Sequence, residues 1–182
     1  RASFRALAGA ARAAIPGLNL STDLIVGFPG ETEADFAHSL EFVRAIGFTR
    51  LHVFSYSPRP GTAAARFSDQ IPGPVKKERT RRMIALGQEL SLAFHQGMVG
   101  QTVDVLWETA VGADNGGLRW AGYTNNYVRV IANGSADLFN RVTPVFITTA
   151  RPDGLTGQQV GQLLDPTAGL QSAILNLPSG GR

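Results

Sequence analysis

A turn made of glycine, phenylalanine and proline is the part of this sequence best suited to holding a small molecule. The apolar run Asp23–Val26 ends in Gly27–Gly30, and Glu31 follows directly. Glycines and a proline let a backbone turn tightly and lie close to a bound molecule. In α/β folds, small molecules bind at the carboxyl ends of strands, which is where this turn would lie. The turn is therefore a candidate ligand site, with an ordinary strand-to-helix turn as the alternative.

The elements on either side of the turn predict how it is positioned. Apolar residues at helical spacing predict a helix over 4–15. A strand is expected over Leu18–Val26, and its apolar end suits a parallel strand covered on both faces. Thr32 and Asp35 match a capping box that opens the next helix, and Gly47 is suited to end it.

A second strand, Arg50–Tyr56, completes a β-α-β unit and leads into the proline-rich turn Ser57–Thr62. Two parallel strands do not make a stable sheet of this kind. We therefore expect the missing strands to come from sequence outside this chain or from a partner.

A long helix is predicted over Pro74–Met98, and its first half is basic. Met83, Leu86, Leu90 and Phe94 would line its apolar face. The basic half is either a solvated helix face or a surface that contacts phosphate groups. Its cationic residues are Lys76, Lys77, Arg79, Arg81 and Arg82.

After Gly100 the pattern changes to short β-rich runs separated by turn residues, which predicts a small antiparallel barrel. We place the domain boundary near Val99 and expect a poorly ordered tail over 158–182. Trp107 and Trp120 are expected to pack in the core or at the rim of the barrel. The expected strands are Thr102–Glu108, Leu118–Thr124, Tyr127–Ile131 and Val142–Thr149.

Composition narrows the classes of site that this chain can form. The chain has 182 residues, a net charge of +3 and no cysteine. It therefore has no disulfide, no thiolate metal site and no iron–sulfur cluster held by its own residues. His38, His52 and His95 are far apart in the sequence. With no apolar run long enough to span a bilayer and no signal-peptide pattern, a cytoplasmic protein is expected.

Three stretches in one order carry a resemblance to a known family. They are Ser21–Thr32, His52–Ala64, and the basic segment Val75–Arg79 followed by Val99–Leu106. Together they resemble the carboxyl-terminal part of a radical-SAM tRNA methylthiotransferase, over residues 1–157. Within the family, these motifs and Gly122–Tyr127 are most similar to the branch that modifies N6-threonylcarbamoyladenosine in tRNA.

The resemblance implies a fold in two parts. Residues 1–98 would be the last part of a radical-SAM partial barrel, a parallel β-α-β unit with helices. Residues 99–157 would be a TRAM domain, a small RNA-binding β-barrel, and 158–182 the tail.

The implied reaction adds a methylthio group to C2 of N6-threonylcarbamoyladenosine next to the anticodon. It uses S-adenosylmethionine and two [4Fe–4S] clusters, whose cysteine ligands this chain lacks. We therefore expect the chain to be a fragment, inactive alone, of a cytoplasmic enzyme that binds the tRNA anticodon loop.

By resemblance, the strand ends would line the cofactor pocket. Phe28 and Ile25 would pack on the adenine, and the backbone of Gly27 and Gly30 would pair with the ligand. For Glu31, helix-start electrostatics is the alternative, and for Arg59 it is a rim position in solvent. The cofactor-binding residues implied are Ile25, Gly27, Phe28, Pro29, Gly30, Glu31, Tyr56 and Arg59.

RNA contact is expected from two places. The basic helix would supply electrostatic attraction, because residues 99–157 carry four arginines against five acidic residues. The barrel would contribute stacking and hydrogen bonds. The residues are Lys76, Lys77, Arg79, Arg81 and Arg82 on the helix and Tyr123, Asn125, Asn126, Tyr127 and Arg129 on the barrel.

Two other functions fit the same residues. The first is a non-catalytic RNA-binding TRAM module, which the absence of cysteine favours. The second is a methylthiotransferase of another branch, acting on isopentenyladenosine in tRNA or on a ribosomal protein.

Overall fold

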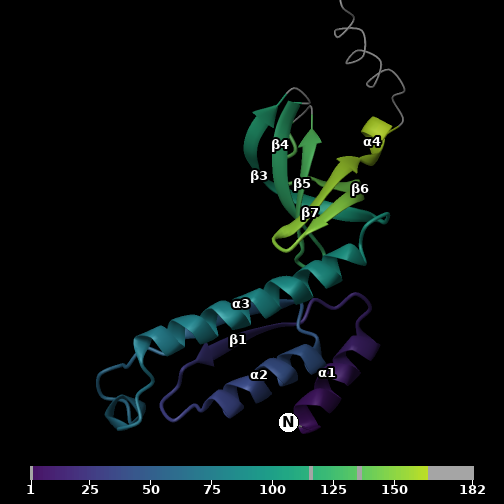
Figure 1. Ribbon diagram of the computed structural model, residues 1–182. Helices are drawn as coiled ribbons and strands as arrows, with labels where there is room; N and C mark the ends of the chain where they lie inside the picture. The colour runs from purple at the N-terminus through teal and green to yellow at the C-terminus, as the bar shows by residue number, and fades with distance from the viewer. Residues whose placement is uncertain (1, 115–116, 135–136, 164–182) are drawn as a thin grey trace, which may run out of the picture. The chain divides into compact units, whose positions relative to one another are not determined.

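The structure, a computed structural model, describes residues 2–114, 117–134 and 137–163. The chain divides into two units, Arg1–Gly97 with Arg151–Asp153, and Met98–Ala150 with the residues from Gly154 onward. The first is an α/β unit and the second a β-barrel (Figure 1). The α/β unit contains α1 (Ala2–Ala14), β1 (Ser21–Val26), α2 (Glu33–Ile46), β2 (Arg50–Ser55), the short 3₁₀ helix η1 (Ala64–Arg66) and α3 (Gly73–Gln96).

Both ends of α2 form as the local sequence predicts. The Thr32 hydroxyl accepts from the Asp35 amide, and the Thr32 amide donates to the Asp35 carboxylate, each at 3.1 Å. At the other end Gly47 has φ +70°, and its amide donates to the Val43 carbonyl. A left-handed residue at this point suits glycine, which has no Cβ. The capping box and the glycine stop are thus confirmed.

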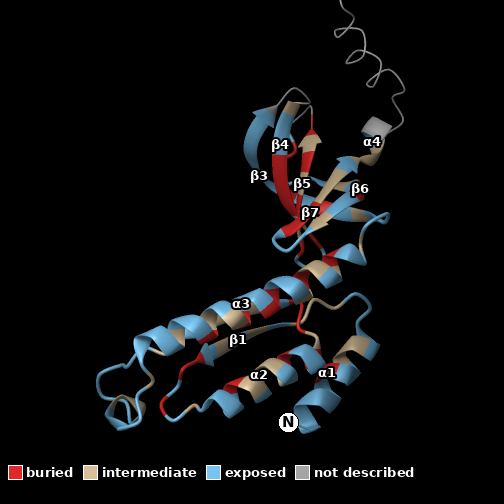
Figure 2. Cartoon of the chain, in the orientation of Figure 1, coloured by how far each residue is buried: buried red, intermediate tan, exposed pale blue. Residues whose placement is uncertain are grey.

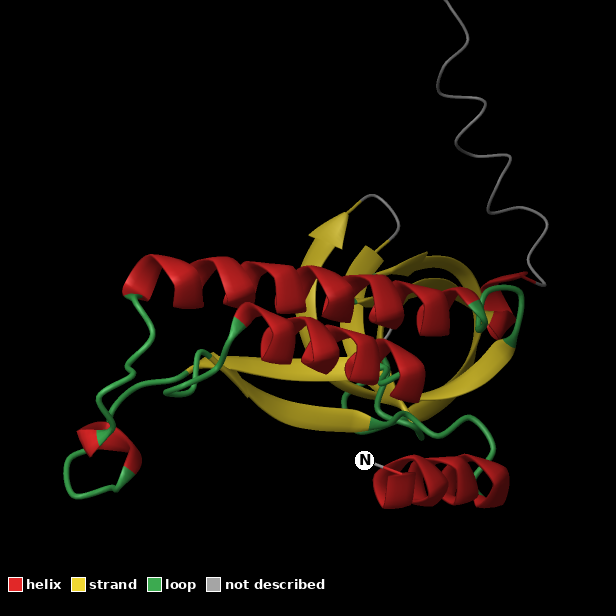
Figure 3. Ribbon diagram, turned by 60° about the horizontal axis from the view of Figure 1, so that its bottom comes forward, coloured by secondary structure: helices red, strands yellow, loops and turns green. Residues whose placement is uncertain are grey.

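Strands β1 and β2 pair in parallel, with Ile25 opposite Phe54 and Val26 opposite Ser55. This confirms the predicted β-α-β unit. Helices α2 and α3 lie side by side over one face of the sheet (Figures 1 and 3). Gly87 lets α3 lie close to β2, because an added Cβ at Gly87 would lie 3.2 Å from the Leu51 side chain.

The core of this unit lies between the sheet and the two helices. Val26, Phe36 and Met83 have no exposed surface and form one cluster with Val43 and Ile46. Burying such side chains is the main favourable contribution to folding.

The opposite face of the sheet is exposed. Burial is not uniform along the chain (Figure 2), and in both strands alternate residues are exposed, namely Asp23 and Ile25 from β1 and His52 and Phe54 from β2. Among the described residues, β1 and β2 pair only with each other. The expectation that further strands complete this sheet therefore remains a prediction.

The second unit is a closed five-stranded barrel with the strand order β3-β4-β5-β7-β6. The predicted small barrel is thus confirmed, although β5 and β7 pair in parallel. The strands are β3 (Thr102–Asp114), β4 (Gly117–Thr124), β5 (Arg129–Gly134), β6 (Val142–Arg151) and β7 (Gly154–Gln159), followed by the short helix α4 (Val160–Leu163).

Three details of the barrel differ from the sequence-based expectation. β3 continues beyond Glu108 to Asp114, through register shifts that let it bend. β5 begins at Arg129, so Tyr127 lies in a turn and not in a strand. β7 was not predicted, because its glycines and glutamines have low strand propensity. β7 includes the first two residues of the expected tail, 158–182. Residues 164–182 of that tail lie outside the described residues.

Both tryptophans are in this barrel and both are buried. The Trp107 indole donates to the Thr143 hydroxyl at 2.7 Å, as a buried indole normally requires. The expectation that they pack in the barrel is confirmed. Over the described part of the chain, none of the helices combines the length and apolar character needed to cross a membrane.

Candidate functional site

The ends of β1 and β2 bring the two predicted ligand-binding turns together. The Tyr56 amide donates to the Val26 carbonyl at 2.9 Å, which extends the pairing to the last residues of both strands. The turn Gly27–Glu31 and the segment that starts at Tyr56 therefore leave the sheet at the same edge. This is the edge where parallel α/β folds bind ligands.

Two pairs of apolar and aromatic side chains lie at this edge, and we call them the strand-end patch: Ile25 with Phe54, and Phe28 with Tyr56. Ile25 and Phe54 are opposite each other in the sheet, and the rings of Phe28 and Tyr56 meet edge to face at 5.2 Å. Ile25 is 56% exposed, Phe54 53% and Phe28 44%. The Tyr56 hydroxyl is buried and has no hydrogen-bond partner in the structure. Exposed apolar groups beside a free polar group are typical of a small-molecule site.

The backbone of the turn has partners within the chain. The Gly27 amide donates to a Glu31 carboxylate oxygen at 2.8 Å, and the Gly30 amide donates to the Asp69 carbonyl at 3.0 Å. These two N–H groups are therefore engaged within the chain, and the expected pairing of the glycine backbone with a ligand stays a prediction. Pro29 is buried and Arg59 is exposed in the turn after β2.

The five basic residues of α3 do not form one surface. Arg79 is buried against Glu31, with 2.7 Å between Nη1 and the carboxylate. Lys76 is half-buried and donates to the Tyr56 carbonyl at 3.0 Å. The other three lie further out: Arg82 pairs with Glu33, Arg81 pairs with Glu78, and Lys77 is exposed.

The Arg82–Glu33 pair sets the ionisation of an exposed carboxyl group. Arg82 donates to Glu33 at 2.6 Å, which lowers the pKa of Glu33 below its ordinary value of 4.5. A carboxyl whose pKa is lowered by folding stabilises the fold above its ordinary pKa. That contribution is lost as the pH falls through the lowered value.

We expect the Arg82→Ala substitution to raise the pKa of Glu33 towards 4.5, because the strongest hydrogen bond to the carboxylate is lost. A carbon-13 NMR titration of the side-chain carboxyl measures this shift directly. Arg44→Ala is the matched control, since Arg44 pairs with Glu89 instead. An unchanged Glu33 titration in the Arg82 variant would show that the pair does not persist in solution.

The barrel carries a row of outward side chains across four strands, which we call the barrel row: Arg129, Tyr123, Leu106 and Val142. Tyr123 is opposite both Arg129 and Leu106, and Leu106 is opposite Val142. Leu106 and Val142 are exposed, although both are apolar. Neither residue was predicted as a site residue from the sequence, but Leu106 lies between the buried residues Val105 and Trp107, and this alternation indicates that it faces outward.

Two turns beside the barrel row present aromatic rings to solvent. Tyr127 is 77% exposed and Phe139 is 65% exposed. Tyr127 (φ +61°) and Asn140 (φ +58°) are the two described non-glycine residues in the left-handed region. A bulky residue in that region carries backbone strain, and strain of this kind is concentrated at functional sites.

Side-chain hydrogen bonds hold the Tyr127 turn. The Thr124 hydroxyl accepts from the Val128 amide at 3.0 Å and donates to the Asn126 side chain at 2.5 Å. Asn125 is exposed at the tip of the turn. The structure thus brings together all five residues predicted for RNA contact on the barrel, and it adds Leu106, Val142 and Phe139 beside them.

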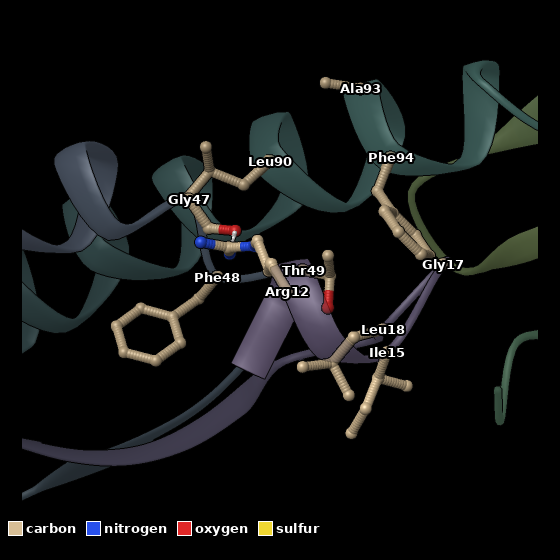
Figure 4. Close-up of a pocket in the computed structure, with 10 residues that line it drawn as sticks. All are labelled: Arg12, Ile15, Gly17, Leu18, Gly47, Phe48, Thr49, Leu90, Ala93 and Phe94. Carbon is tan, nitrogen blue, oxygen red and sulfur yellow. Dashed lines mark hydrogen bonds between the residues drawn. The ribbon is translucent and has the colours of Figure 1, made fainter. Parts of the chain in front are cut away.

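A separate hollow of about 440 Å³ lies in the α/β unit, near the end of α1 (Figure 4). Its walls include Leu90 and Phe94. The Arg12 guanidinium beside it donates to the carbonyls of Ile46 and Gly47, each at 2.6 Å, which satisfies the carboxyl end of α2. None of the residues predicted for a site lines this hollow. Over the described ranges, no group of three or more metal-ligating side chains is present.

Comparison with known proteins finds relatives that act on tRNA. The chain is 39% identical over 137 residues to threonylcarbamoyladenosine tRNA methylthiotransferase MtaB of Bacillus subtilis, covering 75% of the chain and 30% of that protein. It is 43% identical over 146 residues to tRNA-2-methylthio-N6-dimethylallyladenosine synthase of Moorella thermoacetica, covering 80% and 32%. A protein of the same name from Salinispora arenicola is 50% identical over 95 residues, covering 52% and 19%. No protein-family model matches the chain.

The chain spans about a third of the length of the first two of these relatives. They come from both tRNA branches named in the sequence analysis, and the identities do not separate the branches. The family inferred from the three sequence motifs is confirmed: the chain is a homologue of one part of the tRNA methylthiotransferases.

Proposed function

We propose that this chain supplies part of the cofactor pocket and part of the tRNA-binding surface of a radical-SAM methylthiotransferase that acts in the cytoplasm. The observation that carries the proposal is the strand-end patch, an exposed apolar and aromatic cluster at the ligand-binding edge of a parallel sheet. Its position in a homologue of tRNA methylthiotransferases supports a role in binding the adenosyl cofactor.

The residues of the patch fit S-adenosylmethionine. The Phe28 ring and the Ile25 side chain are both exposed and offer apolar surface for adenine. The Tyr56 hydroxyl is buried without a partner, so a ligand group that reached it would supply the hydrogen bond that it lacks. These residues would bind and orient the adenosyl group.

The iron–sulfur clusters do not fit this chain, because it has no cysteine to supply thiolate ligands. Their ligands would lie elsewhere in the enzyme. When bound, S-adenosylmethionine and the clusters supply the chemistry that replaces an adenine C–H with a methylthio group.

The barrel row and the two turns beside it would bind unpaired nucleotides of the anticodon loop. Exposed aromatic rings stack on bases that are free of pairing, and an arginine beside them adds attraction to phosphates and base faces. The barrel has few basic residues, so stacking would contribute more than charge there. Lys77 and Arg81 of α3 would supply the electrostatic part, since both are exposed.

For the substrate, we propose N6-threonylcarbamoyladenosine, modified at C2. The motif Leu51–Thr62, the segment Gly122–Tyr127 and the likeness to MtaB support this branch. The second candidate is the dimethylallyladenosine branch, which is favoured by the relatives that are 43% and 50% identical.

Nucleoside analysis of tRNA from a strain in which the gene is disrupted separates these candidates. Total tRNA is digested and its methylthio nucleosides are measured by mass spectrometry. We expect loss of the methylthio derivative of threonylcarbamoyladenosine and its return when the gene is restored. Loss of the dimethylallyl derivative would assign the other branch, and unchanged amounts of both would overturn the proposal.

A further inference from the structure

We propose that Arg79 of α3 is a positioning residue that holds the turn Gly27–Glu31 in its ligand-binding shape. This inference rests on the proposed function for the identity of the ligand, but its geometry stands by itself. A buried guanidinium, a partly buried carboxylate and the amide of Gly27 form one connected set of hydrogen bonds.

The Arg79 guanidinium binds Glu31 in two ways. Its Nη1 donates to the Glu31 carboxylate at 2.7 Å and to the Glu31 carbonyl at 2.8 Å. The same carboxylate oxygen accepts from the Gly27 amide at 2.8 Å. Arg79 and Glu31, which are 48 positions apart in the sequence, therefore close the turn from both of its ends.

Lys76, one helical turn before Arg79, holds the neighbouring strand end. Its ammonium group donates to the Tyr56 carbonyl at 3.0 Å. Its side chain passes so close to Gly27 that an added Cβ there would lie 2.4 Å from Lys76 Cγ. Because residues three apart lie on the same face of a helix, one face of α3 supports both strands at the edge that carries the strand-end patch.

The turn needs such support because its own backbone restrains it weakly. Gly27 and Gly30 have φ values of +71° and +80°, and glycine has access to many other conformations. A planar guanidinium that donates to both a side chain and a backbone carbonyl fixes orientation as well as distance. Phe28 lies within the turn, so fixing the turn also keeps its ring against Tyr56.

The burial of Arg79 excludes the role that its sequence context suggested. Its side chain is 6% exposed, so its guanidinium is not available to an RNA phosphate. A buried ion pair is in itself weak support for stability, because desolvation offsets much of the attraction. Its effect on the geometry of the turn is therefore the property to measure.

Amide hydrogen exchange of Gly27 in the 182-residue chain tests this role. We expect Arg79→Met to speed Gly27 exchange roughly tenfold or more relative to Val43 in the core of α2, because a charge-assisted bond holding the turn is lost. Arg79→Lys, which keeps the charge without the planar fork, should give a smaller increase. Arg81→Met is the matched control, since the Arg81 side chain is 71% exposed and pairs with Glu78 of its own helix.

The ratio of the two rates separates positioning from general destabilisation. If Gly27 and Val43 speed up by the same factor in both Arg79 variants, or if Gly27 does not change, the proposal is wrong. Glu31→Gln should reproduce the Arg79→Met result, and the double variant should show little further increase, because both substitutions break the same set of bonds.

A titration with S-adenosylhomocysteine tests the proposed function separately. We expect roughly tenfold weaker binding by Arg79→Met than by Arg81→Met. If the unmodified chain does not bind S-adenosylhomocysteine while Arg79→Met still speeds exchange at Gly27 alone, the cofactor assignment is wrong and the positioning role is kept. Equal binding by the two variants would show that the turn does not orient the adenosyl group.

Discussion

Removing both tyrosine rings, in a Tyr123→Ala, Tyr127→Ala double variant, is expected to weaken RNA binding by the chain roughly a hundredfold. Loss of a ring that stacks on a base costs about 1–3 kcal/mol for each base. Tyr127 extends from a strained turn and Tyr123 lies in the barrel row beside it. Fluorescence anisotropy with a labelled anticodon-loop oligonucleotide measures the change.

The control for this experiment is an exposed ring away from the barrel row. Phe67→Ala removes such a ring from the α/β unit, and it should leave RNA affinity unchanged. Tyr123→Phe and Tyr127→Phe keep the stacking surface and should bind nearly as well as the unmodified chain. Equal binding by the double alanine variant and the unmodified chain would show that RNA does not use this surface.

Tyr127→Gly separates function from stability at the same position. Glycine adopts φ +61° without strain, so this variant should be at least as stable as the chain with tyrosine. Its RNA affinity should still fall about tenfold, since the ring is gone. Tyr127 carries backbone strain that glycine would avoid. We therefore expect its ring to contribute to binding, which agrees with the occurrence of strain at functional sites.

The parts of the fold that local sequence determines were predictable. The capping box at Thr32, the left-handed stop at Gly47 and the parallel pairing of the two strands all follow from neighbouring residues and were confirmed. In the barrel, β7 was missed because closure of the barrel, and not the residue preferences of Gly154–Gln159, makes it a strand. Tertiary context commonly overrides β-propensity in this way.

The candidate site, too, could be predicted only in part. Glycines and aromatic residues at the ends of two predicted strands lie at one edge of the sheet, as the sequence predicts, and their contact with a ligand stays a prediction. What the sequence could not show is that Arg79, 48 positions after Glu31, binds it from a separate helix. A run of basic residues looks the same in the sequence whether its members face solvent or a partly buried carboxylate. In the structure Arg79 binds Glu31 and Lys76 binds the Tyr56 carbonyl, whereas Lys77 and Arg81 are exposed.

Replacing Phe36 with alanine is expected to lower the free energy of unfolding of the α/β unit by about 3–5 kcal/mol. Phe36 has no exposed surface and lies in the core with Val26 and Met83. The guanidinium carbons of Arg79 and Arg82 lie 5.6 Å and 4.8 Å from the centre of its ring. The substitution leaves a cavity and removes the surface on which these two side chains rest.

Two optical signals allow this loss to be assigned to one unit. Circular dichroism at 222 nm follows mainly the long helices of the α/β unit, whereas tryptophan fluorescence follows only the barrel, because Trp107 and Trp120 both lie there. In urea, Phe36→Ala should move the circular dichroism transition to a lower urea concentration and leave the fluorescence transition unchanged. Phe28→Ala, which removes an exposed ring from the strand-end patch, should shift neither by more than a small amount. If both signals shift together in Phe36→Ala, the two units unfold as one, and the loss cannot be assigned to the α/β unit alone.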